Sequence, residues 1–416
     1  MTNVGLFFGQ GNRLTSLFIF VFFATLLSTK SIYSYSLGVL VFFCLWRIRF
    51  FRSVSLDRPE KIIFFWVFLF SFFCILTTLW HGSYSRSFEV PIKFALSIPL
   101  FVYFFKFPPK PIAFWCGLSV SVISGFGVAV WKMFQSGEFK AFGYTGAIQF
   151  GNISLTIAIF LLAGFFWLCI NRSRFRISWL ILCALGAIFG LLGSYYSGTR
   201  GGWVAIPVFF VIFMLFFIRQ NRSYSGYILV LASIAIAGGF VSNSSIITHR
   251  IENVRQDITE YQINGASSSS SLGARFAIWE ASLNILSKQP VLGLGEIQFR
   301  EKLKEAVEAG ELGVVPANLA NTHNTFLEIW VLYGGISLFA LIGFLISNIY
   351  YFYVYMRSPD SVISCYGLLG FCLTIGYIIY GQTQIMLIRN NTLVFFLLTL
   401  GVILSLIKQR KKYINN

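Results

Sequence analysis

One histidine lies where a polar segment gives way to a long apolar run. The segment NLANTHNTFLEIWVLYGGISLFAL begins at Asn318 and places His323 among asparagines and threonines. The chain contains three histidines in all. An imidazole has an ordinary pKa of about 6.5 and can take a proton from an attacking hydroxyl at neutral pH. His323 is therefore the first candidate for a catalytic residue.

Cationic side chains are expected at the same end of the apolar segments as His323. Arg200 lies in GSYYSGTRGGW, Arg275 in SLGARFAIWEASLNILSKQP and Arg389 in QIMLIRNN, while Lys93 lies about a turn inside an apolar run. A charge near hydrocarbon is unfavourable unless it is paired or hydrated, so such residues are functional candidates by default. Each also has a structural interpretation. A histidine at a helix start often serves as a hydrogen-bonding group, and an arginine such as Arg200 can anchor a helix at the membrane surface.

Several arginines beside one histidine indicate a particular chemistry. The guanidinium group matches phosphate oxygens with two parallel hydrogen bonds. No D-x-D motif or similar acidic pair that would hold Mg²⁺ or Mn²⁺ occurs near this end of the apolar segments. Cationic side chains can neutralise a departing diphosphate in place of a metal ion. The set predicts transfer of a group from a lipid diphosphate to a hydroxyl, with no metal and no cofactor.

The composition is that of an all-α polytopic membrane protein. Hydrophobic residues make up 56% of the 416 residues, charged residues only 11%, and the mean hydropathy is +0.74. A transmembrane helix needs about 20 apolar residues. We expect a single transmembrane domain over residues 1–416 with about 12 transmembrane helices, near residues 14–29, 32–46, 61–80, 90–105, 111–134, 148–170, 177–195, 203–218, 226–242, 325–355, 362–381 and 392–407.

The basic charge of the chain follows the topology of these spans. If the chain starts in the cytoplasm, more than half of its 32 lysines and arginines lie at the cytoplasmic ends of the spans. This bias is the positive-inside rule, so both termini are expected in the cytoplasm. The net charge of +17 is then no indication of nucleic-acid binding. All seven cysteines lie in apolar spans, and their positions predict neither disulfides nor a metal site.

One large loop, residues 243–324, is expected on the external side between the ninth and tenth spans. It contains most of the acidic residues of the chain and a serine tract, 267–271, that is typical of a flexible linker. Apolar residues at 272, 276, 279, 283 and 286 predict an amphipathic helix that lies on the membrane or caps the bundle. Residues 296–309 predict a second, more polar helix.

Four motifs in this order resemble those of the bacterial O-antigen ligase family. They are GAIQFGNISL, GSYYSGTRGGW, SLGARFAIWEASLNILSKQPVLGLG and NTHNTFLEIWVLYGG. The resemblance implies a multi-pass glycosyltransferase of the inner membrane of a Gram-negative bacterium, with its active site facing the periplasm. Its donor would be O-antigen polysaccharide on undecaprenyl diphosphate, and its acceptor a sugar hydroxyl of lipid A-core, with inversion at the anomeric carbon.

The resemblance also assigns roles to residues. Arg200 and Arg275 would bind the diphosphate and His323 would be the general base, so these three form the expected catalytic set. The expected substrate-binding residues are Arg389, Asn324, Lys93, Gln149 and Asn152.

Three other activities remain open at this point. An O-antigen polymerase would join two undecaprenyl-linked chains, and a related ligase would deliver glycan to protein. A lipid-diphosphate flippase or permease would use the arginines to bind its cargo and would not need His323 as a base. The single large loop favours the O-antigen ligase.

Overall fold

Helices form the regular secondary structure of the described part of the chain. The structure, a computed structural model, describes residues 11–82, 85–137, 140–171, 176–199, 201–220 and 245–415. Over these ranges it contains no β-strand, only one isolated bridge between Asn12 and Pro109. The predicted all-α class is therefore confirmed for these residues.

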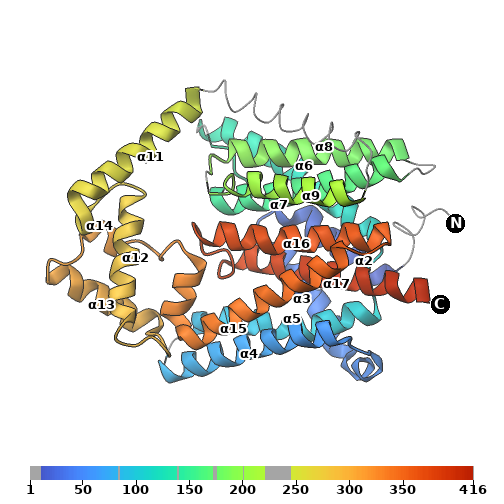
Figure 1. Ribbon diagram of the computed structural model, residues 1–416, viewed down its shortest axis with the longest axis horizontal. Coiled ribbons are helices and arrows are strands. Elements are labelled where there is room, and N and C mark those ends of the chain that lie inside the picture. The colour runs from blue at the N-terminus through green and yellow to red at the C-terminus, as the bar shows by residue number, and fades with distance from the viewer. Residues whose placement is uncertain are drawn as a thin grey trace.

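Long apolar helices pack side by side as a bundle (Figure 1). They are α2 (Arg13–Leu26), α3 (Ile32–Trp46), α4 (Arg58–Trp80), α5 (Glu89–Lys106), α6 (Pro111–Ser136), α7 (Ala147–Ile170), α8 (Arg176–Tyr196), α9 (Ala205–Gln220), α15 (Thr325–Met356), α16 (Ser361–Gly381) and α17 (Asn390–Asn415). Short 3₁₀ turns occur at η1 (Ile48–Ser53) and η2 (Ser85–Phe88). Each bundle helix coincides with one of the predicted spans. The remaining predicted span, 226–242, lies outside the described residues.

Among the described residues, fewer helices than predicted are long and apolar enough to cross a membrane. Seven of the described helices are long and apolar enough, namely α4, α6, α7, α8, α15, α16 and α17. Helices α2 and α3 have 14 and 15 residues, fewer than the roughly 20 that span a bilayer. Helix α5 contains Glu89, Lys93 and Lys106 within 18 residues. The structure therefore supports a multi-pass membrane protein, and the count of 12 stays a prediction.

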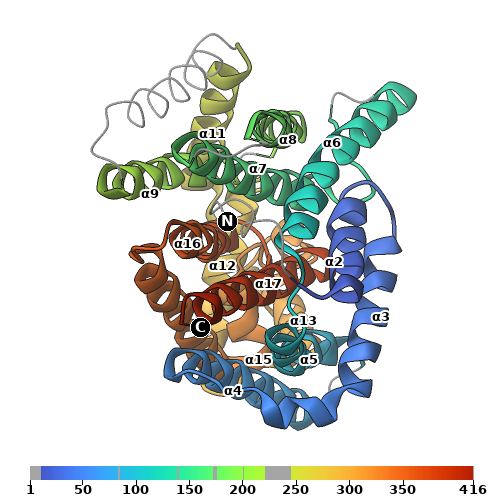
Figure 2. The same ribbon diagram turned by 90° about the vertical axis from the view of Figure 1, so that its right-hand side faces the viewer.

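Helix α17 lies in the middle of the bundle. It contacts α16, α5 and α7, and Figure 2 shows it surrounded by other helices. Its residues from Thr392 to Ile407 are all buried. A helix that is apolar on all its faces is stable only in such a surrounded position. This burial fixes the start of α17, which directly follows Arg389.

The helices between α9 and α15 form a separate layer at one end of the bundle. They are α11 (Ser245–Asn264), α12 (Gly273–Leu286), α13 (Gly295–Glu308) and α14 (Val314–Ala317), with the 3₁₀ turn η3 (Gly265–Ser267). The C-terminal end of α17 lies at the opposite end of the bundle (Figure 1). There three lysines and arginines of α17 form ion pairs with acids at the starts of α4 and α16, namely Lys408–Glu60, Arg410–Asp360 and Lys411–Asp57.

Two predicted helices of this layer are present with nearly the predicted bounds. They are α12, predicted over 272–286, and α13, predicted over 296–309. The predicted face of α12 is rotated from the real one, because its most buried residues are the small or apolar Gly273, Ala274, Ala277, Ile278, Ser282 and Leu286, whereas Leu283 is 49% exposed. Small residues let α12 approach its neighbours closely. Ala277, Ile278 and Leu286 join residues that include Leu294, Phe299 and Leu327 in a second hydrophobic core, distinct from that of the bundle.

The serine tract is ordered, and its interpretation as a flexible linker is wrong. Glu260 of α11 accepts hydrogen bonds from the Ser268 hydroxyl (2.5 Å) and from the amides of Ser269 (2.9 Å) and Ser270 (3.1 Å). These bonds lower the pKa of Glu260 to about 2, and the bond from the Ser268 hydroxyl has the largest effect. The Ser270 hydroxyl in turn accepts from the amide of Gly273, at the start of α12. A side chain distant in sequence therefore fixes the segment that precedes Arg275.

Helix α15 is broken at Gly334, where the layer joins the bundle. Gly334 has φ 83° and ψ 167°, a conformation accessible to glycine and not to other residues without strain. The amide of Gly335 donates to the carbonyl of Pro290 (2.9 Å), and the amide of Leu294 donates to the carbonyl of Val331 (2.8 Å). The loop after α12 therefore replaces helical hydrogen bonds lost at the break and fixes the layer on α15.

Candidate active site

The sequence before α15 folds into a tight turn that presents His323. Asn324 is the N-cap of α15, and its side-chain oxygen accepts from the amides of Phe326 (2.9 Å) and Leu327 (3.2 Å). The amide of His323 donates to the side-chain oxygen of Asn321 (3.0 Å). His323 has φ 54°, and among the described residues it is the one non-glycine with positive φ. Such a conformation is unfavourable and marks a turn held in place by its surroundings.

Thr322 is held on both sides by residues of different helices. Its amide donates to Glu328, in the first turn of α15, at 2.7 Å. Its carbonyl accepts from the indole N–H of Trp279, on α12, at 2.6 Å. The turn that carries His323 is therefore connected both to the bundle and to the layer formed by α11 to α14.

Arg275 and Arg389 lie near the imidazole of His323. Arg275 is on α12, one turn before Trp279, and burial lowers the pKa of its guanidinium. Arg389 is exposed and directly precedes α17. Burial first, and then the positive charges of Arg275 and Arg389, lower the pKa of His323 to about 4. The imidazole is therefore neutral at physiological pH, and its Nδ1 atom is buried without a hydrogen-bond partner among the described residues.

Neither arginine forms a salt bridge with a carboxylate of the described residues. This contrasts with the opposite end of the bundle, where the basic residues of α17 are paired with acids. Two cations that neighbour a neutral histidine and have no acidic partner among the described residues form an electropositive site. Such a site fits an anion with several oxygens, and guanidinium groups suit a phosphate in particular.

The loop from α16 to α17 is attached to the start of α15. The hydroxyl of Thr325 donates to the carbonyl of Gln384 (2.7 Å) and accepts from the amide of Met386 (2.8 Å). The hydroxyl of Thr392 also bonds to the carbonyl of Met386. These buried contacts place the segment that ends at Arg389 beside the helix that follows His323.

Arg200 lies outside the described residues, so its predicted role is not tested by the structure. The glycines after it are described, and both pack tightly. A Cβ atom on Gly201 would clash with the hydroxyl of Thr383, and one on Gly202 with the side-chain oxygen of Asn152. The segment that follows Arg200 therefore contacts both α7 and the loop that leads to Arg389.

The other predicted substrate-binding residues differ in their surroundings. Asn152 is fully buried on α7, where its amide contacts the sulfur of Met386 (3.4 Å), and its oxygen has no partner among the described residues. Gln149 folds against Gly146 at the start of α7. Lys93 donates to Glu89 on its own helix (3.0 Å). The oxygen of Asn324 is occupied by its capping bonds. A role in substrate binding stays a prediction for each of these four.

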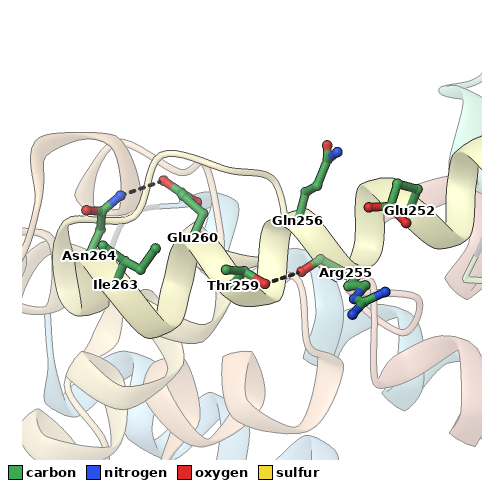
Figure 3. A pocket seen from close by; sticks show the side chains of 7 residues that line it. All are labelled: Glu252, Arg255, Gln256, Thr259, Glu260, Ile263 and Asn264. Carbon is green, nitrogen blue, oxygen red and sulfur yellow. Dashed lines mark hydrogen bonds between the residues drawn. The ribbon is translucent and has the colours of Figure 1, made fainter.

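The described residues contain no group of three His, Cys, Asp or Glu side chains arranged to hold a metal ion. A shallow hollow of about 310 Å³ lies on α11 and is lined by Glu252, Arg255, Gln256, Thr259, Glu260, Ile263 and Asn264 (Figure 3). None of the predicted site residues lines it. The hollow is therefore separate from the cationic site around His323.

Sequence reasoning missed the roles of three residues that shape the site, namely Asn321, Trp279 and Glu328. All three act on the His323 turn through the backbone of residues 322 and 323. Trp279 and Arg275 are four residues apart and so lie on one face of α12. That spacing is visible in the sequence, but the contact of this face with Thr322 is not.

The fold and the site define a multi-pass helical membrane protein with a cationic, histidine-containing site at one end. Residues 185–342 match the protein family described as "O-Antigen ligase". This match confirms the predicted family. It implies a membrane glycosyltransferase activity of the ligase or polymerase type. The matched segment includes Arg200, Arg275 and His323, whereas Arg389 and Asn152 lie outside it.

A relative with nearly the same length is also found. The chain is 27% identical over 389 residues to an uncharacterized protein of Haemophilus influenzae. The aligned region covers 92% of this chain and 95% of that protein. The similarity therefore includes the bundle helices that lie outside the family match.

Proposed function

We propose that the protein is an O-antigen ligase. It transfers polysaccharide from undecaprenyl diphosphate to a sugar hydroxyl of lipid A-core. The reaction takes place at the periplasmic side of the inner membrane of a Gram-negative bacterium, with both termini of the enzyme in the cytoplasm. The family match supports the glycosyltransferase class, and the site residues support the choice of a diphosphate donor.

The surroundings of His323 give the strongest support for this function. Arg275 and Arg389 both lie close enough to lower the pKa of its imidazole, and neither is neutralised by a described carboxylate. A diphosphate bound by these arginines would supply the missing negative charge. The acceptor hydroxyl would then meet a neutral imidazole that is able to take up its proton.

The reaction follows from these positions. The nitrogen of His323 takes the proton of the acceptor hydroxyl while the hydroxyl oxygen forms a bond to the anomeric carbon of the donor. The bond from that carbon to the diphosphate oxygen breaks, and undecaprenyl diphosphate leaves with the electron pair. Arg275 and Arg389, together with Arg200, stabilise the charge that develops on the leaving group. A direct displacement of this kind inverts the anomeric carbon and needs no metal ion.

The layer of α11 to α14 would give access to two amphiphilic substrates. Helix α12 carries Arg275 and packs against the start of α15 through the second hydrophobic core. The donor would reach the site from the membrane with its diphosphate at the level of the lipid headgroups. The acceptor sugar would enter from the aqueous side, where residues before α15 are exposed.

The test compares lipopolysaccharide from a deletion strain with that from strains complemented by wild type or by His323→Ala. We expect the deletion and His323→Ala strains to lack O-antigen on lipid A-core and to accumulate long undecaprenyl-linked polymer. Lipid A-core carrying a single repeat unit would instead indicate a polymerase. Full activity of His323→Ala would contradict a general-base role and favour a transport protein. Transfer by the purified enzyme should persist in EDTA, and its loss would contradict the metal-independent mechanism.

A further inference from the structure

We propose that Trp279 is a positioning residue for transfer: its indole N–H holds the His323 turn against the helix that carries Arg275. The inference rests on the proposed function, in which the diphosphate-binding arginine and the base must act on the same donor. Trp279 touches neither substrate in this scheme. It acts through the backbone of Thr322.

The geometry of α12 directs the indole of Trp279 toward the His323 turn. Arg275 and Trp279 are four residues apart and therefore lie on one face of the helix, about a turn from each other. The indole N–H of Trp279 donates to the carbonyl of Thr322 at 2.6 Å. The indole ring packs edge-on against Phe276, with ring centroids 5.6 Å apart. The ring is thus fixed, and its N–H is aimed at the residue directly before His323.

The amide of Thr322, on the other side of the residue from the carbonyl that Trp279 binds, is bonded to α15. Glu328 is buried in the first turn of α15 and accepts from the amide of Thr322 at 2.7 Å. The two peptide groups that flank Thr322 are therefore bonded to two different helices. Trp279 connects Thr322 to the layer of α11 to α14, and Glu328 connects it to the bundle.

These two bonds maintain an unfavourable backbone conformation at His323. His323 has φ 54°, which a non-glycine residue keeps only when neighbouring contacts over-determine it. Hydrophobic contacts between α12 and α15 are non-directional and permit small sliding motions. The hydrogen bond from Trp279 is directional, so it fixes the position of the imidazole relative to Arg275. A misplacement of about 1 Å can lower the rate of an enzyme by about 100-fold.

The experiment measures transfer by the purified full-length protein in nanodiscs, with an undecaprenyl-diphosphate-linked glycan and lipid A-core. Trp279→Phe keeps the aromatic packing and removes the indole donor. Trp167→Phe is the matched control, because its indole N–H also bonds a carbonyl, that of Ser361 (2.9 Å), away from the His323 turn. Glu328→Gln keeps an oxygen that can accept from Thr322, and Glu328→Leu does not.

We expect Trp279→Phe to lower kcat by about tenfold or more, with the donor KM changed by less than about threefold. The acid limb of its kcat/KM profile should move to higher pH, because Arg275 no longer lies as close to His323. Trp167→Phe and Glu328→Gln should keep most of the activity, and Glu328→Leu should lose it.

Two results would overturn the positioning role. One is an unchanged kcat for Trp279→Phe per folded molecule, whether or not its thermal stability falls. The other is an equal loss of kcat in Trp167→Phe. Failure of wild type to transfer glycan in the same assay would instead contradict the proposed function, so the two failures are distinguishable.

Discussion

At the scale of single residues, the charge state of His323 depends on what occupies the site. Burial and two neighbouring arginines lower its pKa to about 4 in the free protein. A bound diphosphate would offset the charge of those arginines and raise this pKa. The donor would therefore convert a weakly basic imidazole into a stronger base at the moment when the base is needed.

We expect the pH profiles of kcat/KM and of kcat to differ. The neutral imidazole is the active form, so activity is present above the pKa of His323 and is lost as the pH falls through it. We expect the acid limb of kcat/KM, which reports the free enzyme, nearer pH 4 than 6.5. The acid limb of kcat, which reports the complex with donor, should lie at higher pH. Coincident limbs near pH 6.5 would contradict the influence of the arginines.

Arg275 should contribute its shape as well as its charge. Lysine cannot form the two parallel hydrogen bonds that a guanidinium forms with phosphate oxygens. We expect Arg275→Lys to raise the donor KM by about tenfold or more, and Arg275→Gln to have a larger effect. Lys288→Gln, an exposed change just beyond the same helix, is the control and should leave donor KM unchanged. Equal KM values for wild type and Arg275→Lys would argue against bidentate binding.

At the scale of elements, the break in α15 connects the layer of α11 to α14 to the bundle. A Cβ atom on Gly334 would clash with the carbonyl of Val291 and would also strain a backbone with φ 83°. We expect Gly334→Ala to destabilise the protein by about 2 kcal/mol and to displace the loop after α12. Gly127→Ala is the control, since a Cβ atom there meets nothing within 4 Å. Thermal unfolding in detergent gives the comparison, and equal stability of the two variants would contradict this role of the break.

At the scale of the whole molecule, the distribution of ion pairs suggests an orientation. The basic end of α17 lies opposite the layer of α11 to α14 (Figure 1), and the positive-inside rule assigns that basic end to the cytoplasm. The cationic site would then face the periplasm, where completed O-antigen would be joined to lipid A-core.

Site-directed labelling tests this orientation. Val314 on α14 is 61% exposed and Tyr413 at the end of α17 is 43% exposed. We expect Val314→Cys to react with a membrane-impermeant maleimide in cells with a permeabilised outer membrane. Tyr413→Cys should react only after the inner membrane is opened. The wild-type protein, whose seven cysteines are buried or half-buried, is the background control. The reverse pattern would place the site in the cytoplasm.

The sequence by itself determined the class of the protein and most of its helices. Long apolar runs can satisfy their backbone hydrogen bonds in a membrane only as helices, so their positions follow from composition alone. The four motifs determined the family, which the match over residues 185–342 confirms. The bounds of α12 followed closely from the spacing of its apolar residues, since that signal is local.

The tertiary structure alone decided how the site is assembled. Contacts between distant segments cannot be read from local spacing, and each important feature here is such a contact. Glu260 orders the serine tract, the loop at Pro290 fills the break at Gly334, and Trp279 bonds to Thr322. Together with the bonds of Thr325 to Gln384 and Met386, such contacts bring Arg275 and Arg389 to His323, because the three residues belong to segments that are far apart along the chain.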